Sequence, residues 1–386
     1  AGQAEYVRSV HPMERDLRWQ VGQKLAVGFP GTEVPQALRE LVAEYKIGTG
    51  KKVLDKEREK SKLEKIAGLA STDFTRCGVT ELFEQIMAMS RKRQYQMLRE
   101  HGITDEMDFV PVESLPVEHK KIVFQGVEGA YAQVAMETFF GNDTENFHVE
   151  SWRDAMEAIK NGEADYAVLP LENSSAGIVS QNYDLLMEYD NCIVGEQIIK
   201  IDHCLLGTKD AQLSDITQVY SHPQGLMQCA GFLEAHRGWE SISTKNTAMA
   251  AKKIKEDAKK NQAAIASRLT ADIYGLKLLK ESVQDNPNNS TRFIIVSSKK
   301  MYVRDAKKIS ICFEIPHESG SLYHALSHFI YNNLNMDHIE SRPIQDRNWE
   351  YRFFIDFVGN LEDCAVKNAL RGLKEETVKL KILGNY

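Results

Sequence analysis

The sequence predicts a multidomain protein in which an all-α domain, an α/β domain and a smaller α+β domain follow one another. Three changes of pattern support this prediction. Apolar residues recur at helical spacing between residues 53 and 100. Short buried strands alternate with helices from residue 120 to about 300, and the order β-α-β-β-α-β follows between 308 and 383. The 386 residues suffice for two or three domains.

Composition excludes several classes of protein. The net charge of −7 argues against a general nucleic-acid-binding protein. No apolar run approaches the roughly 20 residues that span a bilayer, and no signal peptide is visible. The six cysteines are scattered, as in reduced cytoplasmic proteins. Zinc spacing, a phosphate loop and a complete dinucleotide fingerprint are absent, so we expect a cytoplasmic protein without metal, cofactor, nucleic-acid or membrane partner.

The predicted domains are a helical domain over 1–103, a linker over 104–119, an α/β domain over 120–300 and an α+β domain over 305–386. Within the helical domain, Ser90 and Gln94 continue the apolar stripe of the helix predicted for 79–100. Polar side chains that face a bundle interior need partners, and exposure by rotation of the stripe is the alternative. Residues 1–40 are atypical because Pro35 interrupts them, and an interior proline costs a helix about 3 kcal/mol.

Two polar clusters follow apolar strands in the α/β region, at 170–177 and 220–229, and a third at 288–293 is predicted to lie in a loop that enters the strand 293–296. Together they closely resemble the signature stretches of prephenate dehydratase. The resemblance implies two α/β lobes, like those of a periplasmic binding protein, with the substrate in the cleft between them. It also implies conversion of prephenate to phenylpyruvate with loss of water and carbon dioxide, for which no metal or redox cofactor is required.

The resemblance assigns roles to residues of these clusters. Thr291 would hydrogen-bond or relay a proton to the leaving oxygen, because its own hydroxyl is too weak an acid to be a free proton source. Arg292 is the expected partner of a substrate carboxylate, with packing against a protein carboxylate as the alternative. His222 is a general acid or a structural turn residue. The remaining implied cleft residues are Asn173, Ser174, Ser221 and Gln228.

A second resemblance lies upstream, where residues 46–59 and the helix with Ser90 and Gln94 resemble the all-helical chorismate mutase domain. It implies rearrangement of chorismate to prephenate, with Lys46 and Gln94 at the ether oxygen. Arg58 and Ser90 would contact carboxylates, and Asp55 and Glu59 the substrate hydroxyl or neighbouring side chains. Pro35 replaces one arginine of the family's first helix, Arg18 lies where the other would fall, and Arg39 is a possible substitute. A mutase remnant without activity, which dimerises the protein, is the alternative.

The C-terminal region resembles the ACT regulatory domain, which is ferredoxin-like, in its two phenylalanine-binding stretches. The resemblance implies inhibition by L-phenylalanine in a pocket between paired domains, so a homodimer or homotetramer is expected. A non-catalytic amino-acid sensor is the alternative from another functional class, and it would need no hydroxyl at Thr291. The implied effector residues are Gly320, Ser321, Leu322, Glu340, Ser341, Arg342 and Pro343.

Overall fold

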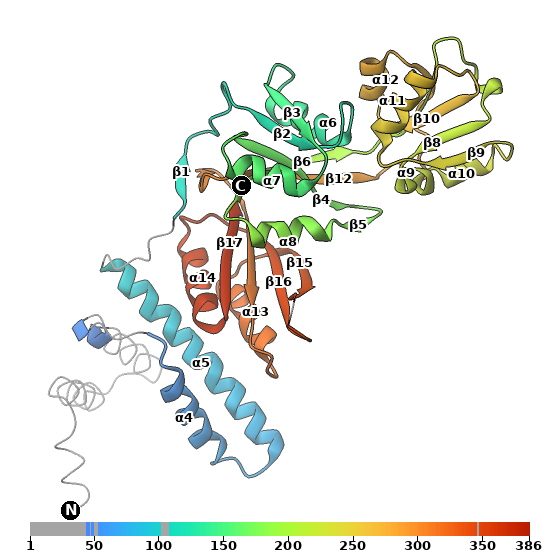
Figure 1. Cartoon of the computed structure of the whole chain (residues 1–386). Helices are drawn as coiled ribbons and strands as arrows, with labels where there is room; N and C mark the ends of the chain where they lie inside the picture. The colour runs from blue at the N-terminus through green and yellow to red at the C-terminus, as the bar shows by residue number, and fades with distance from the viewer. Residues whose placement is uncertain (1–43, 47, 50–52, 102–107, 346) are drawn as a thin grey trace, which may run out of the picture. The chain divides into compact units, whose positions relative to one another are not determined.

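The computed structural model describes residues 44–46, 48–49, 53–101, 108–345 and 347–386 (Figure 1). Arg18, Pro35, Arg39 and the atypical segment 1–40 lie outside the described residues. The described chain divides into two compact units. The first holds the described residues up to 101 with 315–335 and 362–379, and the second holds 108–314, 336–361 and 380–386. These units differ from the predicted domains, because the C-terminal region contributes to both.

The first unit is built from helices. They are α4 (Lys56–Ala67), α5 (Asp73–Glu100), α13 (Ser321–Tyr331) and α14 (Cys364–Glu376). The helical pattern predicted between residues 53 and 100 is confirmed as α4 and α5, but α5 begins at Asp73 rather than at residue 79. Thr72 caps this start, because its Oγ1 accepts a hydrogen bond of 3.2 Å from the Thr75 backbone N–H. The first turns of α5 are exposed, so they lack the apolar stripe that predicts a helix.

The second unit contains a ten-stranded sheet. Its main path runs in the order β15 (Met336–Pro343), β16 (Tyr351–Val358), β14 (Lys308–Glu314), β17 (Lys379–Asn385), β6 (Cys192–Lys200), β12 (Ser290–Ser297), β4 (Tyr166–Asn173), β2 (Ile122–Gln125) and β3 (Asn146–Val149), and β5 (Gly177–Ile178) pairs with β4. The helices α6 (Tyr131–Phe140), α7 (Trp152–Lys160) and α8 (Ser180–Glu188) belong to this lobe, which we call lobe one. β17 joins β6 where Gly384 lies opposite Ile193.

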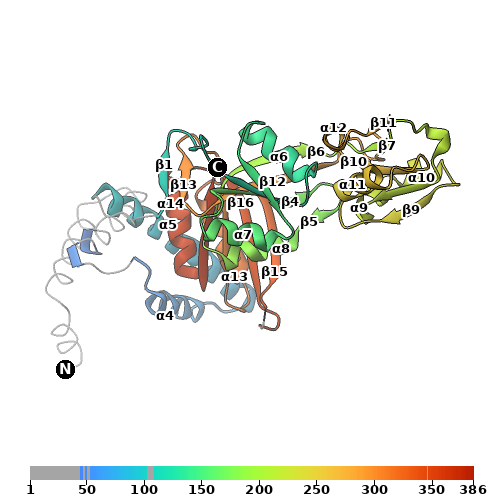
Figure 2. The same ribbon diagram turned by 45° about the horizontal axis from the view of Figure 1, so that its top comes forward.

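A five-stranded sheet forms the core of lobe two (Figure 2). Its order is β11 (Lys277–Lys280), β7 (Cys204–Gly207), β10 (Gln262–Ala266), β8 (Gln218–Ser221) and β9 (Glu240–Ser243). Its helices are α9 (Pro223–Gln228), α10 (Ala230–Glu234), α11 (Thr247–Asp257) and α12 (Arg268–Tyr274). Residues 201–203 connect β6 to β7, and 281–289 connect β11 to β12, so two segments join the lobes. The predicted two-lobed α/β arrangement is confirmed.

The helical stretch after β8 is divided at Cys229 into α9 and α10. Both carboxylate oxygens of Asp285 accept hydrogen bonds of 3.1 Å from the Gly231 backbone N–H. The Asp285 side chain therefore gives this N–H, at the start of α10, the hydrogen-bond partner that a capping residue provides at a helix end. The split is not visible in the local sequence because Asp285 lies far along the chain.

Strand β12 separates two apolar cores of the second unit. Phe293 and Ile295 pack in a core with residues of α6 and β6. Ile294 and Val296 pack in the other core, which also contains Cys312, Phe354 and Leu383 of the C-terminal strands. Side chains of a strand alternate between the two faces of its sheet, so the two faces of β12 pack in two different apolar cores.

The predicted linker is corrected in part. β1 (Val110–Val112) pairs in parallel with β13 (Met301–Val303), so this stretch belongs to the second unit, whereas 104–107 lie outside the described residues. The prediction was wrong because Pro111 suggested a loop, although a proline fits a strand with an unpaired edge. None of the helices in the described part of the chain is long and apolar enough to cross a bilayer.

Gly384→Ala tests the junction between β17 and β6. A methyl group there would lie 2.0 Å from the Ile193 carbonyl oxygen. We expect the free energy of unfolding to fall by about 1–3 kcal/mol, the usual cost of overpacking, in urea titrations followed by circular dichroism. Gly238→Ala is the control, because its added methyl meets nothing within 4 Å. Equal stability of the two variants would show that β17 does not need the close approach.

Candidate active site

The two central residues of the site lie inside strand β12, not in the loop before it as predicted. The strand begins at Ser290, and Thr291 pairs with Asn173 of β4 and Ile199 of β6. Thr291 is buried and shares its face with Phe293, whereas Arg292 points to the opposite face with Ile294. A shift of register against β4 between Arg292 and Phe293 marks a local irregularity of the kind that re-aims side chains near functional sites.

Thr291 belongs to a cluster of neutral polar groups that joins β4 to β12. The Asn173 Nδ2 atom donates to Thr291 Oγ1 at 2.8 Å, to Asn289 Oδ1 at 3.0 Å and to the Ser290 carbonyl oxygen at 3.1 Å. The Asn173 Oδ1 atom accepts from the backbone N–H groups of Ser175 and Ala176 at 3.0 and 2.8 Å. Asn289 was quoted in the sequence motif without a role, and here its buried side chain completes the cluster.

These contacts determine which group donates. Two backbone N–H groups face Asn173 Oδ1, so the amide must be oriented with its NH₂ toward Thr291. The Thr291 oxygen therefore accepts, and its own proton remains available for another acceptor. Among the described residues, no carboxylate or imidazole is hydrogen-bonded to Thr291. The arrangement suits donation of a hydrogen bond to a substrate oxygen.

Ser174 ties the two loops of this cluster together. Its Oγ accepts from the Ser290 backbone N–H at 3.0 Å and donates to Asn289 Oδ1 at 3.4 Å. Its own backbone N–H donates to the Ser290 carbonyl oxygen at 2.9 Å. The side chain remains exposed, so Ser174 both supports the cluster and reaches solvent.

The predicted cleft residues of lobe two are engaged inside that lobe. Ser221 is fully buried, and its hydroxyl donates to the Ile265 carbonyl oxygen at 2.7 Å, so in this structure it does not reach solvent as a ligand would. Gln228 Oε1 lies 2.9 Å from His203 Nε2. His222 caps α9, where its Nδ1 accepts from the Gln224 N–H at 3.1 Å, which favours the structural alternative.

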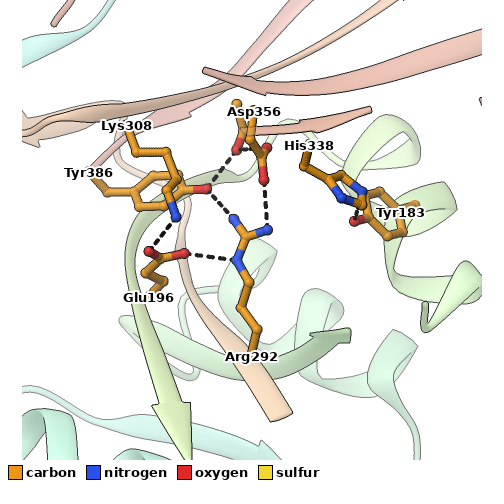
Figure 3. Close-up of polar contacts among 8 residues, drawn as sticks. Tyr183, Glu196, Arg292, Lys308, His338, Asp356 and Tyr386 are labelled. Carbon is orange, nitrogen blue, oxygen red and sulfur yellow. Dashed lines mark hydrogen bonds and ion pairs between the residues drawn. The ribbon is translucent and has the colours of Figure 1, made fainter. Parts of the chain in front are cut away.

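Arg292 contacts protein groups in this structure, and its expected role as a substrate ligand stays a prediction. Its Nε donates to Glu196 at 2.8 Å, and its two terminal nitrogens donate to Asp356 at 2.6 Å and to the Tyr386 hydroxyl at 2.7 Å (Figure 3). Lys308 donates to the other oxygen of Glu196 at 2.6 Å. The alternative, packing against protein carboxylates, is therefore what the structure contains.

This charged network is largely buried and balanced. Only 12% of the Arg292 side chain and 8% of the Asp356 side chain are exposed. Burial opposes ionisation of the guanidinium, but Tyr386, Asp356 and Glu196 raise the pKa of Arg292 above its ordinary value. Two cations, Arg292 and Lys308, face two carboxylates, which is how buried charges are accommodated.

In the first unit, the predicted residues on α5 are not exposed by rotation of the stripe, since Gln94 is buried and Ser90 is half-buried. Gln94 is 4% exposed, and its Nε2 donates to Ser90 Oγ at 3.1 Å. Its Oε1 is buried without a hydrogen-bond partner among the described residues. A buried unpaired acceptor is costly and is a feature of a site that a ligand completes.

Lys46 and Arg58 form the cationic part of this region. Lys46 is half-buried, and burial and the charge of Arg58 lower the pKa of its amino group. Asp55 caps α4 by accepting from the Arg58 backbone N–H at 3.1 Å, which supports the orienting role among its two alternatives. Like charges held close together favour binding of an anion between them.

Glu59 is engaged by a residue that the sequence analysis missed. Arg91 of α5 pairs with Glu59 and lies 3.3 Å from Glu376 of α14. Its position next to Ser90 in the sequence was the available signal. The pair leaves Glu59 oriented by a protein cation in this structure.

The predicted effector residues are divided between the two units. Gly320 adopts φ +84° just before α13, a left-handed conformation that favours glycine, and Ser321 and Leu322 begin that helix. Residues 340–343 lie on β15, where Arg342 donates to Asp184 at 2.7 Å. Effector binding by these residues stays a prediction.

Comparison with known proteins identifies two families within the chain. Residues 122–301 match the family model of prephenate dehydratase, and residues 37–95 match that of chorismate mutase type II. The bifunctional chorismate mutase/prephenate dehydratase of Escherichia coli (strain K12) is 33% identical over 358 residues, which cover 90% of each chain.

Two solved structures share the fold of the larger part. A prephenate dehydratase from Arthrobacter aurescens in complex with L-Phe is 30% identical with a TM-score of 0.64, over 69% of this chain and 89% of that one. GqqA, described as a novel type of quorum quenching acylase, is also 30% identical with a TM-score of 0.64, over 69% of this chain and 97% of that one.

Asp356→Asn tests the charged network around Arg292. Removing the charge of Asp356 leaves two cations, Arg292 and Lys308, facing the single carboxylate of Glu196, so the free energy of unfolding should fall by about 3 kcal/mol. Denaturant titration measures the change. Glu188→Gln is the matched control, since its partner Arg153 is exposed and exposed pairs contribute little. A loss no greater than that of the control would contradict a stabilising role for the pair.

Proposed function

The chain belongs to the family of bifunctional chorismate mutase/prephenate dehydratases, and from that premise we propose that Thr291 and its amide partners carry the dehydratase reaction. The enzyme rearranges chorismate to prephenate and converts prephenate to phenylpyruvate with loss of water and carbon dioxide. These are steps of phenylalanine biosynthesis, subject to inhibition by L-phenylalanine.

The hydrogen-bond order around Thr291 is the observation that carries the proposal. Asn173 donates to Thr291 Oγ1, so the threonine proton is free for the ring hydroxyl oxygen of prephenate as that oxygen departs. Donation into Oγ1 polarises the Thr291 O–H bond, because hydrogen bonds in a chain strengthen one another. Aromatisation of the ring supplies the driving force, so a positioned donor suffices where no strong acid is present.

The mutase reaction needs positioning and charge rather than covalent catalysis. Lys46 and Arg58 hold the carboxylates and the ether oxygen of chorismate, and the buried Gln94 faces the same substrate. Asp55 caps the start of α4 and so holds the backbone of Arg58 in place, and Ser90 orients the Gln94 amide. Gln94 Oε1 has no hydrogen-bond partner among the described residues, and this supports an active site over an inactive remnant because burial of an unpaired acceptor is costly.

The C-terminal region is proposed to be a ferredoxin-like ACT domain over 305–386. Its elements occur in the order β-α-β-β-α-β, and its strands lie in the order β17, β14, β16 and β15. Gly320 and residues 340–343 would bind L-phenylalanine between paired domains. The enzyme would then act in the cytoplasm as a homodimer or homotetramer.

Thr291→Val tests the dehydratase proposal. Loss of the hydroxyl should lower kcat for prephenate by at least about 10²-fold, the lower range for a positioned proton donor. Prephenate binding should persist, and Thr291→Ser should restore turnover. Chorismate turnover by the same preparation controls for folding. Unchanged prephenate turnover in Thr291→Val would contradict the role of the hydroxyl.

The pH dependence of the mutase reaction tests Lys46. Burial and Arg58 lower the pKa of Lys46 from 10.5, so rising pH removes its positive charge below that value. We expect kcat/KM for chorismate to decline on the alkaline side with a midpoint below 10.5. Lys46→Arg keeps the charge and should move the decline to higher pH. The same alkaline profile in both proteins would exclude Lys46 as its origin.

A further inference from the structure

His203 lies where the two lobes meet, in the connection between β6 and β7, and no motif of the sequence points to it. The side chain is 2% exposed, and both ring nitrogens are in contact with polar atoms. Nδ1 lies 3.0 Å from the Tyr131 hydroxyl and Nε2 lies 2.9 Å from Gln228 Oε1. A buried imidazole with two such neighbours is held in one orientation.

The partners of His203 come from both lobes. Tyr131 begins α6 of lobe one, and its ring packs edge-on against the imidazole at 5.6 Å. Gln228 ends α9 of lobe two. The contact chain from Tyr131 to Gln228 therefore crosses from one lobe to the other through a single side chain.

The second connection between the lobes, residues 281–289, is hydrogen-bonded to the backbone of His203. The His203 backbone N–H donates to Gln284 Oε1 at 2.9 Å, and its carbonyl oxygen accepts from the Val283 N–H at 2.9 Å. Two residues further on, the Asp285 N–H donates to the Gln228 carbonyl oxygen at 2.8 Å. The segment then continues to Asn289 and Thr291, so the surroundings of His203 are linked by a short stretch of chain to the proposed proton donor.

The chemistry of the ring determines how Gln228 is presented. Burial lowers the pKa of His203, so at neutral pH the ring is uncharged and carries one N–H. Gln228 Oε1 can only accept, so that proton is on Nε2 and Nδ1 is unprotonated. The single proton of the Tyr131 hydroxyl lies between two acceptors, the Asp202 carbonyl oxygen at 2.9 Å and His203 Nδ1 at 3.0 Å. Burial also raises the pKa of Tyr131, which keeps its hydroxyl protonated as a donor. With Oε1 occupied, the NH₂ group is the part of Gln228 left for a substrate oxygen.

We propose that His203 is a positioning residue of the dehydratase reaction, which orients the Gln228 amide so that its NH₂ donates to an oxygen of the substrate, and which ties that orientation to lobe one through Tyr131. The inference rests on the dehydratase function proposed above. It also gives Gln228 a defined part: a neutral donor to a substrate carboxylate or hydroxyl, on the lobe opposite Thr291. With Arg292 occupied by Glu196 and Asp356, such donors are needed at the substrate.

Two substitutions of His203 separate its contacts. His203→Gln can place an amide nitrogen near the position of Nε2 and keep a donor for Gln228. His203→Asn can place an amide oxygen near the position of Nδ1 and keep only an acceptor for Tyr131. If the role is positioning of Gln228, His203→Asn should lower kcat/KM for prephenate about 10- to 100-fold, since small misplacements cost up to about 10²-fold. His203→Gln should retain most of the activity.

A double-mutant cycle with Gln228→Ala shows whether His203 acts through Gln228. Residues that act through one contact give non-additive losses, so His203→Asn should have little further effect on kcat/KM in a Gln228→Ala background. Thermal unfolding and chorismate turnover of every variant show that the chain is folded. Additive losses, equal losses in His203→Asn and His203→Gln, or full activity of His203→Asn would each overturn the inference.

The wild-type assay distinguishes two failures. A wild-type chain that does not convert prephenate would contradict the dehydratase proposal itself. An active wild type in which Gln228→Ala is impaired but His203→Asn is not would overturn only the role of His203, and leave Thr291 and Asn173 as proposed.

Discussion

The alternation of side chains along β12 is the constraint on which the second unit depends. Thr291 faces a cluster of neutral amides and hydroxyls, and Arg292, one residue later, faces a charged network shared with the C-terminal strands. The two environments have opposite requirements. A hydroxyl that donates to a substrate needs neutral, oriented neighbours, whereas a buried guanidinium needs carboxylates within contact distance. One strand in the middle of a sheet satisfies both because its faces are separated by the sheet itself.

Much of the architecture was predictable because the pattern of apolar residues changes with each kind of element. The helices α4 and α13 and the buried strands β2 and β10 follow directly from periodicity and apolar runs. The elements that were missed, such as α8 and β3, are short or carry polar residues on their exposed faces. The β1 strand was hidden by Pro111, since local composition does not reveal a pairing with residues almost two hundred positions later.

The site was predictable where the chemistry is local and not where it depends on distant partners. Asn173 and Thr291 were named from their motifs, and the structure brings them into contact. Arg292 was expected to bind a substrate carboxylate because its guanidinium suits one, with a protein carboxylate as the alternative. The protein carboxylates that it contacts lie 96 and 64 residues away in sequence, so local sequence could not identify them. The role of His203 could not be predicted from the sequence, where it is a single histidine beside an apolar run. Its contacts come from residues of both lobes, which only the structure brings together.

The pairing of β12 along both edges also has a mechanical consequence. β12 is hydrogen-bonded to β4 on one side and to β6 on the other. Sliding it along its axis would break both sets of backbone hydrogen bonds at once, so the strand moves as a rigid element. The peptide unit between Thr291 and Arg292 is planar and holds their Cα atoms about 3.8 Å apart. A shift of the Arg292 backbone that follows movement of Asp356 therefore displaces the Thr291 backbone by a comparable distance. No intervening side chains lie between the two residues to reduce that displacement.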